Sequence, residues 1–252
     1  MDKKIKLSAT VITHNEAGDI MRCLDSLVGV ADEIVIVDNF SSDKTLEIVR
    51  NFTNRVFLKK FESYGTQKQF ALEKTSSDWV INIDADEELS QPLREEILKL
   101  KEDPGEYSGF SMPFNVFFLG KRLRFGGCSN EHHLRLFKKE KASYRGKRIH
   151  EGIIVEGKTR VLKGHVNHYT YADLEEYLKK FNQYTTLIAH EKNASGERFN
   201  IFYVFRLPVE FITRYFVKLG FLDGWHGFLY ALLASYYALF KYLKLWDLQR
   251  EK

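Results

Sequence analysis

The chain has 252 residues, of which 44% are hydrophobic, and its formal net charge at pH 7 is +4. This length allows one sizeable α/β domain with an appendage, whereas the small net charge excludes a strongly basic nucleic-acid-binding protein. Two cysteines, Cys23 and Cys128, are too few for a disulfide framework and indicate a reducing cytosol.

Strands and helices alternate over the first part of the chain. Short apolar runs predict strands at residues 7–13, 33–37, 55–58 and 79–83. Helices are predicted at residues 19–28, from Ser42 or Asp43 to 52, at 65–74, and from Ser90 and Pro92 to 101. Alternation at this spacing is typical of βαβ units, so we expect a mostly parallel sheet.

The alternation stops after Pro104 and Gly105, where a mixed region begins. Further strands are predicted at residues 109–118, 134–138, 152–156 and 159–162. A long helix is predicted at 171–192, because its apolar positions recur at helical spacing. The expected fold is an α/β, Rossmann-like mixed sheet flanked by helices over residues 1–193, followed by a C-terminal helical region over residues 194–252.

Three carboxylates, Asp84, Asp86 and Glu87, follow the predicted strand at 79–83. Ligands of open α/β sheets bind beyond such strand ends, and the spacing of Asp84 and Asp86 points both side chains the same way if the backbone stays extended. Two carboxylates about 5 Å apart repel by roughly 3 kcal/mol at an effective dielectric near 20. A bound Mg²⁺ or Mn²⁺ would turn that repulsion into attraction. The alternative is a solvated acidic loop that caps the next helix.

The first two predicted strands also end in polar residues. The first ends in Thr13 and is followed by Asn15 and Glu16, and the second is followed by Asp38. A polar residue after a strand is ordinarily a turn or a cap, but three such ends at one edge of a sheet favour a ligand. Acidic side chains there can accept hydrogen bonds from a base or from ribose hydroxyls while a metal holds phosphates. The pattern therefore favours a nucleoside diphosphate ligand.

These motifs resemble those of the inverting family 2 glycosyltransferases, which have the nucleotide-binding fold called GT-A. The matching stretches are VITHNE at 11–16, VIVDNFSSDKT at 35–45 and IDADE at 83–87. His14 is a departure, because many members of the family carry Tyr at this position. A histidine can still stack on the base, although its ring is smaller.

The resemblance implies a role for each of the three strand ends. Thr13 and Glu16, with Asn15 between them, would border the nucleoside, and Asp38 would contact the base. The two aspartates after the fourth strand would form the DxD site that holds the metal and the diphosphate. The expected cofactors are therefore a divalent metal, Mg²⁺ or Mn²⁺, and a nucleotide-sugar donor.

The rest of the chain is similar to a narrower group, the lipopolysaccharide-core β-glucosyltransferases and their relatives. The supporting stretches are YGTQKQFAL at 64–72, LRLFK at 134–138, HE at 150–151, HYTY at 168–171 and GFLDG at 220–224. This likeness implies UDP-glucose as the donor and a lipid-linked glycan, such as lipopolysaccharide core, as the acceptor. Residues 128–130 stand where relatives often have aromatic and Pro residues. This departure affects what the resemblance implies about the shape of the acceptor pocket, but not about the donor site.

An inverting transferase needs a base near the acceptor hydroxyl. Glu151 follows His150 at a position comparable with the family's acidic pair, and it is the preferred candidate. Glu131, which precedes His132 and His133, is the second candidate. Either residue could instead be a surface carboxylate paired with a nearby arginine.

Lys68 and His168 are further candidates for the site. Lys68 could reach the diphosphate as a point charge, or it could be a solvated helix lysine. His168 is a candidate metal or phosphate ligand once the substrate binds, with a structural histidine as the alternative. The cluster of His132, His133, His165 and His168 lacks the H-E-x-x-H and Cys-pair spacings of zinc sites, so zinc is not favoured.

Aromatic, apolar and basic residues mix from residue 199 onward. Residues 227–240 form a run of 14 weakly polar to apolar residues, whereas a membrane-spanning helix needs about 20. The composition favours helices that lie in the headgroup region of an anionic membrane. We therefore expect a peripheral protein at the cytoplasmic face of the cytoplasmic membrane. The alternative is a helical hairpin that packs on the core or forms a dimer.

The expected activity is that of a metal-dependent inverting glycosyltransferase. One alternative is a nucleotidyltransferase that makes an activated sugar, but residues 13–18 lack the Gly-rich, basic phosphate loop that such an enzyme usually has. Another alternative is a non-catalytic, membrane-attached subunit that binds a glycan or a nucleotide. The intact DxD sequence argues against that alternative.

Overall fold

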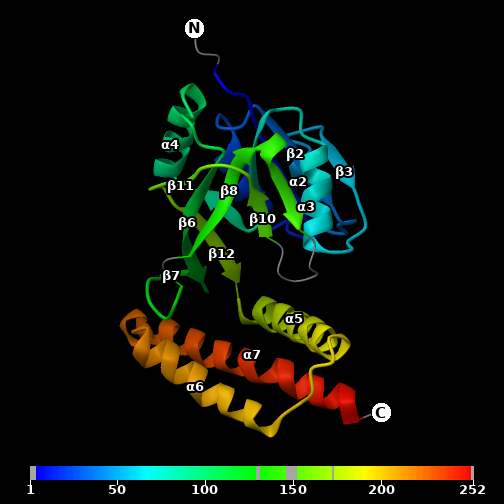
Figure 1. Ribbon diagram of the computed structural model, residues 1–252, viewed down its shortest axis with the longest axis vertical. Helices are drawn as coiled ribbons and strands as arrows, with labels where there is room; N and C mark the ends of the chain where they lie inside the picture. The colour runs from blue at the N-terminus through cyan, green and yellow to red at the C-terminus, as the bar shows by residue number, and fades with distance from the viewer. Residues whose placement is uncertain (1–3, 129–130, 146–151, 172, 251–252) are drawn as a thin grey trace. The chain divides into compact units, whose positions relative to one another are not determined.

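The computed structural model describes residues 4–128, 131–145, 152–171 and 173–250 (Figure 1). The chain divides into two compact units. The first consists of Met1–Phe114 and Glu131–His168, and the second of Asn115–Asn130 and Tyr169–Lys252. The predicted domain boundary between residues 193 and 194 lies inside the second of these units, and it stays a prediction.

A parallel sheet forms the centre of the first unit. β1 (Leu7–Thr13) pairs in parallel with β2 (Glu33–Asp38) on one side and with β4 (Trp79–Asp84) on the other, and β3 (Val56–Leu58) pairs in parallel with β2. Nearly all side chains of β1 and β4 are buried, as expected for strands that are covered on both faces. The parallel sheet that the sequence predicts is confirmed.

Four helices alternate with these strands: α1 (Ile20–Leu27), α2 (Thr45–Val49), α3 (Tyr64–Glu73) and α4 (Gln91–Glu102). α2 is shorter than predicted, and its N-cap is Lys44 rather than Ser42 or Asp43. Asp43 nevertheless accepts a hydrogen bond from the Thr45 N–H at 3.0 Å. Its side chain therefore still satisfies one of the backbone donors in the first turn of the helix.

The sheet continues beyond β4 with mixed strand directions. Its order is β3-β2-β1-β4-β8-β6-β12-β5, and β7 and β11 also pair with β6. The added elements are β5 (Glu87–Leu89), β6 (Gly109–Phe118), β7 (Lys121–Leu123), β8 (His132–Lys138), η1 (Lys139–Lys141), β11 (Thr159–Val161) and β12 (Val166–Tyr171), while β9 (Ala142–Arg145) and β10 (Gly152–Val155) form a separate antiparallel pair. The predicted mixed region is confirmed, although β5, β7, β9 and β12 are not among the predicted strands.

The second unit is mainly helical. It contains α5 (Leu174–Ala194), η2 (Ile201–Phe205), α6 (Arg206–Ile212), η3 (Thr213–Val217), η4 (Gly220–Asp223) and α7 (Gly224–Arg250). Both α5 and α6 pack against α7 (Figure 1). α5 begins later than the predicted residue 171, because Tyr171 belongs to β12 and Asp173 caps the helix by accepting from the Glu176 N–H at 2.8 Å. Among the described helices, none is both long enough and apolar enough to cross a membrane.

Small residues line the buried face of α7. Gly227, Ala231 and Ser235 recur at intervals of four residues and are all buried. A Cβ atom added to Gly227 would lie 1.9 Å from the carbonyl oxygen of Gly220, so close packing requires glycine here. The apolar run at 227–240 therefore uses one face for packing inside the second unit.

Candidate active site

The three strand ends that the sequence singles out lie side by side at one edge of the sheet. Thr13, the last residue of β1, pairs in parallel with Asp38 of β2, and Ile12 pairs in parallel with Asp84 of β4. Because all three strands run in the same direction, their carboxyl ends meet where ligands of open α/β sheets bind. All of the site residues described below belong to the first unit.

Hydrogen bonds tie the loops after β1 and β2 together. The Asn15 N–H donates to Ser41 Oγ at 2.8 Å, and the Ser42 N–H donates to Asn15 Oδ1 at 2.8 Å. His14 Nδ1 lies 2.7 Å from the carbonyl oxygen of Asn39. The two loops therefore form one connected rim, which we call the donor rim.

Asp38 is fully buried beneath this rim. Its carboxylate accepts hydrogen bonds from the Ser41 N–H at 2.8 Å and from the Ser41 hydroxyl. The hydroxyl of Thr13 is buried too, and it has no hydrogen-bond partner within the described part of the chain. Glu16 belongs to the same rim, where its N–H donates to Thr45 Oγ1 at 2.8 Å. A buried hydroxyl without a partner is costly, so Thr13 retains a polar group that a ligand can satisfy.

Two residues of the donor rim have left-handed backbone conformations without being glycine. Both Asn15 and Phe40 have a φ of 54°. Asn adopts this conformation fairly often, but for a bulky residue such as Phe it costs about 1–2 kcal/mol. The Phe40 side chain is 58% exposed. Backbone strain of this kind is concentrated at functional sites, which supports the donor rim as part of the site.

The backbone turns at Ala85 and Asp86 instead of staying extended after β4. Asp84 and Asp86 therefore lack the extended backbone that would point both side chains the same way. Asp84 Oδ1 lies 2.9 Å from Lys68 Nζ, and Asp84 Oδ2 lies 3.0 Å from Arg135 Nη2. Burial opposes ionisation of this carboxyl group, but the charges of Lys68 and Arg135 outweigh it and hold the pKa of Asp84 well below its usual value.

Glu87 and Arg135 form a buried ion pair next to Asp84. Glu87 pairs with Arg135 and accepts a hydrogen bond from the Asp84 N–H at 2.9 Å. Burial raises the pKa of Glu87 to about 7, against the opposing charge of Arg135. Arg135 also donates to Asn82 Oδ1 at 3.1 Å. Neither residue is among the predicted site residues, because Arg135 is brought here by the antiparallel pairing of β8 with β4, which no sequence motif indicates.

Asp86 and His168 form a second pair, with 3.3 Å between Asp86 Oδ2 and His168 Nε2. Burial lowers the pKa of the imidazole, but the hydrogen bond and charge of Asp86 outweigh this effect and raise the pKa of His168 to about 9. Both side chains remain partly exposed.

Carboxylate oxygen and imidazole nitrogen suit a divalent cation such as Mn²⁺, so Asp86 and His168 fit the expected metal. Asp84 fits less well as a ligand, because two cations already neutralise it. The described residues contain no group of three or more His, Cys, Asp or Glu side chains arranged to hold a metal. Oxygens of a bound diphosphate would therefore have to complete the coordination, as they often do for Mg²⁺.

Of the two candidate bases, only Glu131 lies among the residues that the structure describes. Glu131 is exposed, and its Oε2 lies 3.5 Å from Nε2 of His133. Its backbone carbonyl accepts a hydrogen bond from the Phe114 N–H at 3.2 Å, which fixes the start of β8 beside β6. Glu151 and His150 lie outside the described residues. The choice between Glu151 and Glu131 stays a prediction.

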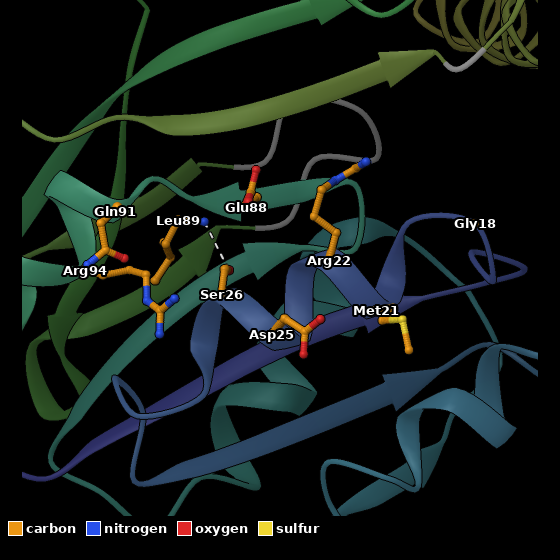
Figure 2. Close-up of a pocket in the computed structure, with 9 residues that line it drawn as sticks. All are labelled: Gly18, Met21, Arg22, Asp25, Ser26, Glu88, Leu89, Gln91 and Arg94. Carbon is orange, nitrogen blue, oxygen red and sulfur yellow. Dashed lines mark hydrogen bonds between the residues drawn. The ribbon is translucent and has the colours of Figure 1, made fainter.

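A surface pocket of about 440 Å³ lies elsewhere in the first unit (Figure 2). It is lined by Gly18, Met21, Arg22, Asp25, Ser26, Glu88, Leu89, Gln91 and Arg94. Figure 2 shows that the Leu89 N–H donates to Ser26 Oγ, at 3.1 Å, and Arg94 donates to the Val28 carbonyl at 2.8 Å. The pocket contains none of the predicted site residues that the structure describes, so we assign it no function.

The fold is that of an α/β protein whose candidate site lies at the carboxyl ends of its parallel strands, where open α/β sheets bind ligands. Residues 8–153 match the family described as Glycosyl transferase family 2. The chain belongs to that family, and it is a glycosyltransferase. The family that the sequence motifs predict is therefore confirmed.

The chain is similar over nearly its whole length to a lipopolysaccharide core glycosyltransferase. Lipopolysaccharide core biosynthesis glycosyltransferase LpsC of Rhizobium meliloti (strain 1021) is 32% identical over 255 residues, which cover 98% of this chain and 94% of LpsC. The uncharacterized glycosyltransferase RT0209 of Rickettsia typhi is 29% identical over 258 residues, which cover 96% of this chain and 87% of that protein.

Solved glycosyltransferase structures are similar only at a low level. S. aureus TarS 1-349 has 14% sequence identity and a TM-score of 0.45, with 98% of this chain and 92% of that chain covered. Glucosyl-3-phosphoglycerate synthase from Mycobacterium tuberculosis, in complex with Mn²⁺, UDP-glucose and phosphoglyceric acid, has 20% identity and a TM-score of 0.37 over 44% of each chain. Similarity at this level transfers neither ligands nor residue roles to this chain.

Proposed function

We propose that this glycosyltransferase is a metal-dependent, inverting enzyme that transfers glucose from UDP-glucose to a sugar hydroxyl of a lipid-linked glycan such as lipopolysaccharide core. The observation that carries the proposal is the meeting of Thr13, Asp38 and Asp84 at one edge of the parallel sheet. The likeness to LpsC, whose name refers to lipopolysaccharide core biosynthesis, supports the choice of acceptor.

The proposed reaction is a single displacement at the anomeric carbon of the donor sugar. The base, Glu151 or Glu131, takes the proton of the acceptor hydroxyl as its oxygen bonds to that carbon. The bond from the same carbon to the diphosphate breaks on the opposite side, so UDP departs and the configuration inverts. Lys68, which pairs with Asp84, would offer its charge to the departing diphosphate.

Asp86 and His168 would hold the divalent metal, and Thr13, Asn15, Glu16 and Asp38 would hold the nucleoside. When bound, the metal would act as a Lewis acid for the leaving UDP. The polar rim residues would orient the donor, since correct orientation removes a large entropic part of the barrier. We also propose that the enzyme works at the cytoplasmic face of the cytoplasmic membrane, where the nucleotide sugar and a lipid-linked acceptor can meet.

The metal assignment can be tested by measuring UDP release from UDP-glucose with Mn²⁺ or Mg²⁺ and core-truncated lipopolysaccharide. We expect Asp86→Ala to reduce turnover by about 10²-fold or more, since the metal that would stabilise the leaving diphosphate loses one of its two proposed protein ligands. Asp25→Ala, which removes an acidic residue of α1 outside the site, should keep the wild-type rate. Equal UDP release by wild type and Asp86→Ala would show that the metal assignment is wrong.

The base and the donor need separate measurements. Of Glu151→Gln and Glu131→Gln, the variant that lacks the true base should lose turnover but still bind UDP. A thermal-shift panel of nucleotide sugars should give the largest rise in melting temperature with UDP-glucose, because a tight ligand stabilises the native state by mass action. A larger rise with another nucleotide sugar would replace UDP-glucose as the donor.

A further inference from the structure

The second unit carries a stripe of exposed apolar side chains along residues 201–217. Ile201, Phe205, Val209, Ile212 and Phe216 are each more than half exposed. They recur at intervals of four, four, three and four residues along a segment that is 3-10 helix at 201–205, α-helix at 206–212 and π-helix at 213–217. Because each is more than half exposed, all five lie on the exposed side of this helical segment. This set is called the apolar stripe below.

Other apolar side chains of the same segment are packed against α7. The Phe211 ring lies 5.8 Å from the Phe228 ring of α7, and the Tyr215 ring lies 5.7 Å from it. The helical segment has thus used one apolar face inside the second unit, and the apolar stripe is a second face. Monomeric soluble proteins rarely expose a continuous apolar patch of this kind unless it is an interaction site.

The exposed apolar surface continues beyond the stripe. Leu219, Phe221, Leu222 and Trp225 are all exposed, and Trp225 stacks on Phe228 with 5.3 Å between the ring centroids. Trp is a residue that favours the interface between lipid and water, because its ring is apolar but carries an N–H donor.

The charges near the stripe favour an anionic partner. The acidic residues of this segment are engaged within the second unit: Glu210 pairs with Arg214 at 2.6 Å, and the buried Asp223 carboxylate accepts a hydrogen bond from the Phe125 N–H at 2.9 Å. The basic residues Arg206 and Lys218, in contrast, are exposed. Exposed cations beside an apolar face complement anionic headgroups.

We propose that residues 201–225 bind an anionic membrane surface by inserting the apolar stripe and Trp225 into the headgroup region, with the helical segment parallel to the bilayer. The contact surface is new, and it rests on the proposed function only in that a lipid-linked acceptor would bring the enzyme to a membrane. The proposed contact precedes residues 227–240, a run in which one face, with Gly227, Ala231 and Ser235, is buried.

Sedimentation of the full chain with vesicles of phosphatidylcholine and phosphatidylglycerol in equal amounts tests the proposal. The stripe variant is Phe205→Ser with Val209→Ser and Phe216→Ser. The matched control is Leu58→Ser with Leu98→Ser and Val161→Ser, which removes exposed apolar side chains from the first unit. We expect wild type and control to bind, and the stripe variant to bind at least about tenfold more weakly, because three inserted side chains are lost. Wild-type binding by the stripe variant would overturn the proposal.

Fluorescence gives a readout that needs no stripe variant. Vesicles containing brominated phosphatidylcholine should quench the emission of wild-type protein, and Trp225→Phe should remove most of that quenching. An absence of quenching in wild type would overturn the proposal. So would a wild-type dimer that binds no vesicles and dissociates in the stripe variant during analytical ultracentrifugation, because the stripe would then bind a second copy of the chain.

The same variants distinguish this inference from the proposed reaction. A thermal shift with UDP-glucose reports on the site in the first unit, and the stripe variant should retain the wild-type shift. A missing shift in all proteins, wild type included, would count against the proposed donor while leaving the vesicle result valid.

Discussion

Arg135→Met should destabilise the protein strongly, because Arg135 neutralises two carboxylates in a buried cluster. Its guanidinium pairs with Glu87 and lies 3.0 Å from Asp84 Oδ2, with only 12% of the side chain exposed. Removing one partner of a buried pair leaves an uncompensated charge and typically costs about 3–5 kcal/mol. Urea unfolding followed by circular dichroism measures the loss directly.

The loss should be smaller when Glu87 is also neutralised. In the double variant Arg135→Met with Glu87→Gln, no carboxylate remains unpaired at position 87, so we expect about 2 kcal/mol of favourable coupling relative to the sum of the single variants. A loss in the double variant equal to the sum of the losses in the two single variants would refute the idea that Arg135 and Glu87 stabilise each other.

The loss in Arg135→Met should also depend on pH. The pKa of Glu87 is raised to about 7 in the folded protein, so its favourable contribution is present at low pH and is lost as the pH rises through that value. Without Arg135 this folded-state pKa rises further. The variant should therefore lose more stability at about pH 8 than at about pH 6 relative to wild type, and an equal loss at both pH values would contradict this assignment.

Three further predictions concern residues outside the charged cluster. Phe40→Gly should raise the free energy of unfolding by about 1 kcal/mol in urea titrations, because glycine adopts the left-handed conformation without strain; a loss of stability would contradict this. Lys101→Met should cost about 2 kcal/mol, since the buried ammonium donates to the Val30 carbonyl at 2.8 Å and pairs with Asp32, while the exposed Lys99→Met should have little effect. Burial alone would raise the pKa of Glu33, but hydrogen bonds from Ser8 and Ser76 and the charge of Arg55 lower it. The contribution of Glu33 to stability is therefore present above pH 4.5 and is lost as the pH falls below that value. Glu33→Gln should accordingly flatten the acid limb of the stability curve, and an unchanged limb would refute the role of Glu33.

The parallel part of the sheet could be predicted because its strands are short apolar runs separated by helices. β1 and β4 are buried on both faces, which leaves a clear sequence signal. β5 could not be predicted in this way, because it has three residues, two of which are glutamates. β12 has alternating polar and aromatic residues, and its last residue, Tyr171, also fits the helical spacing of the residues that follow. Its pairing with β5 is a long-range contact that no local pattern specifies.

The site shows the same division between local and long-range information. The adjacency of Thr13, Asp38 and Asp84 follows from the direction of parallel strands, which the sequence indicates. The partner of Asp86, His168, comes from β12, more than 80 positions later in the sequence. Arg135 reaches Asp84 because β8 runs antiparallel to β4 in a particular register. Such pairings depend on which strands become neighbours, and that information is absent from a motif.

The charge balance of the cluster gives a physical reason for a metal in the proposed reaction. Three carboxylates lie within four residues, at Asp84, Asp86 and Glu87. The described cations in contact with them are Lys68, Arg135 and His168, and the raised pKa of His168 keeps it protonated at neutral pH. Because Glu87 is only partly ionised near its pKa of about 7, two to three negative groups face three positive ones, which leaves little net positive charge for an incoming diphosphate. A divalent cation would supply that charge, and Asp86 is the carboxylate best able to accept it, because its present partner is an imidazole that can lose its proton.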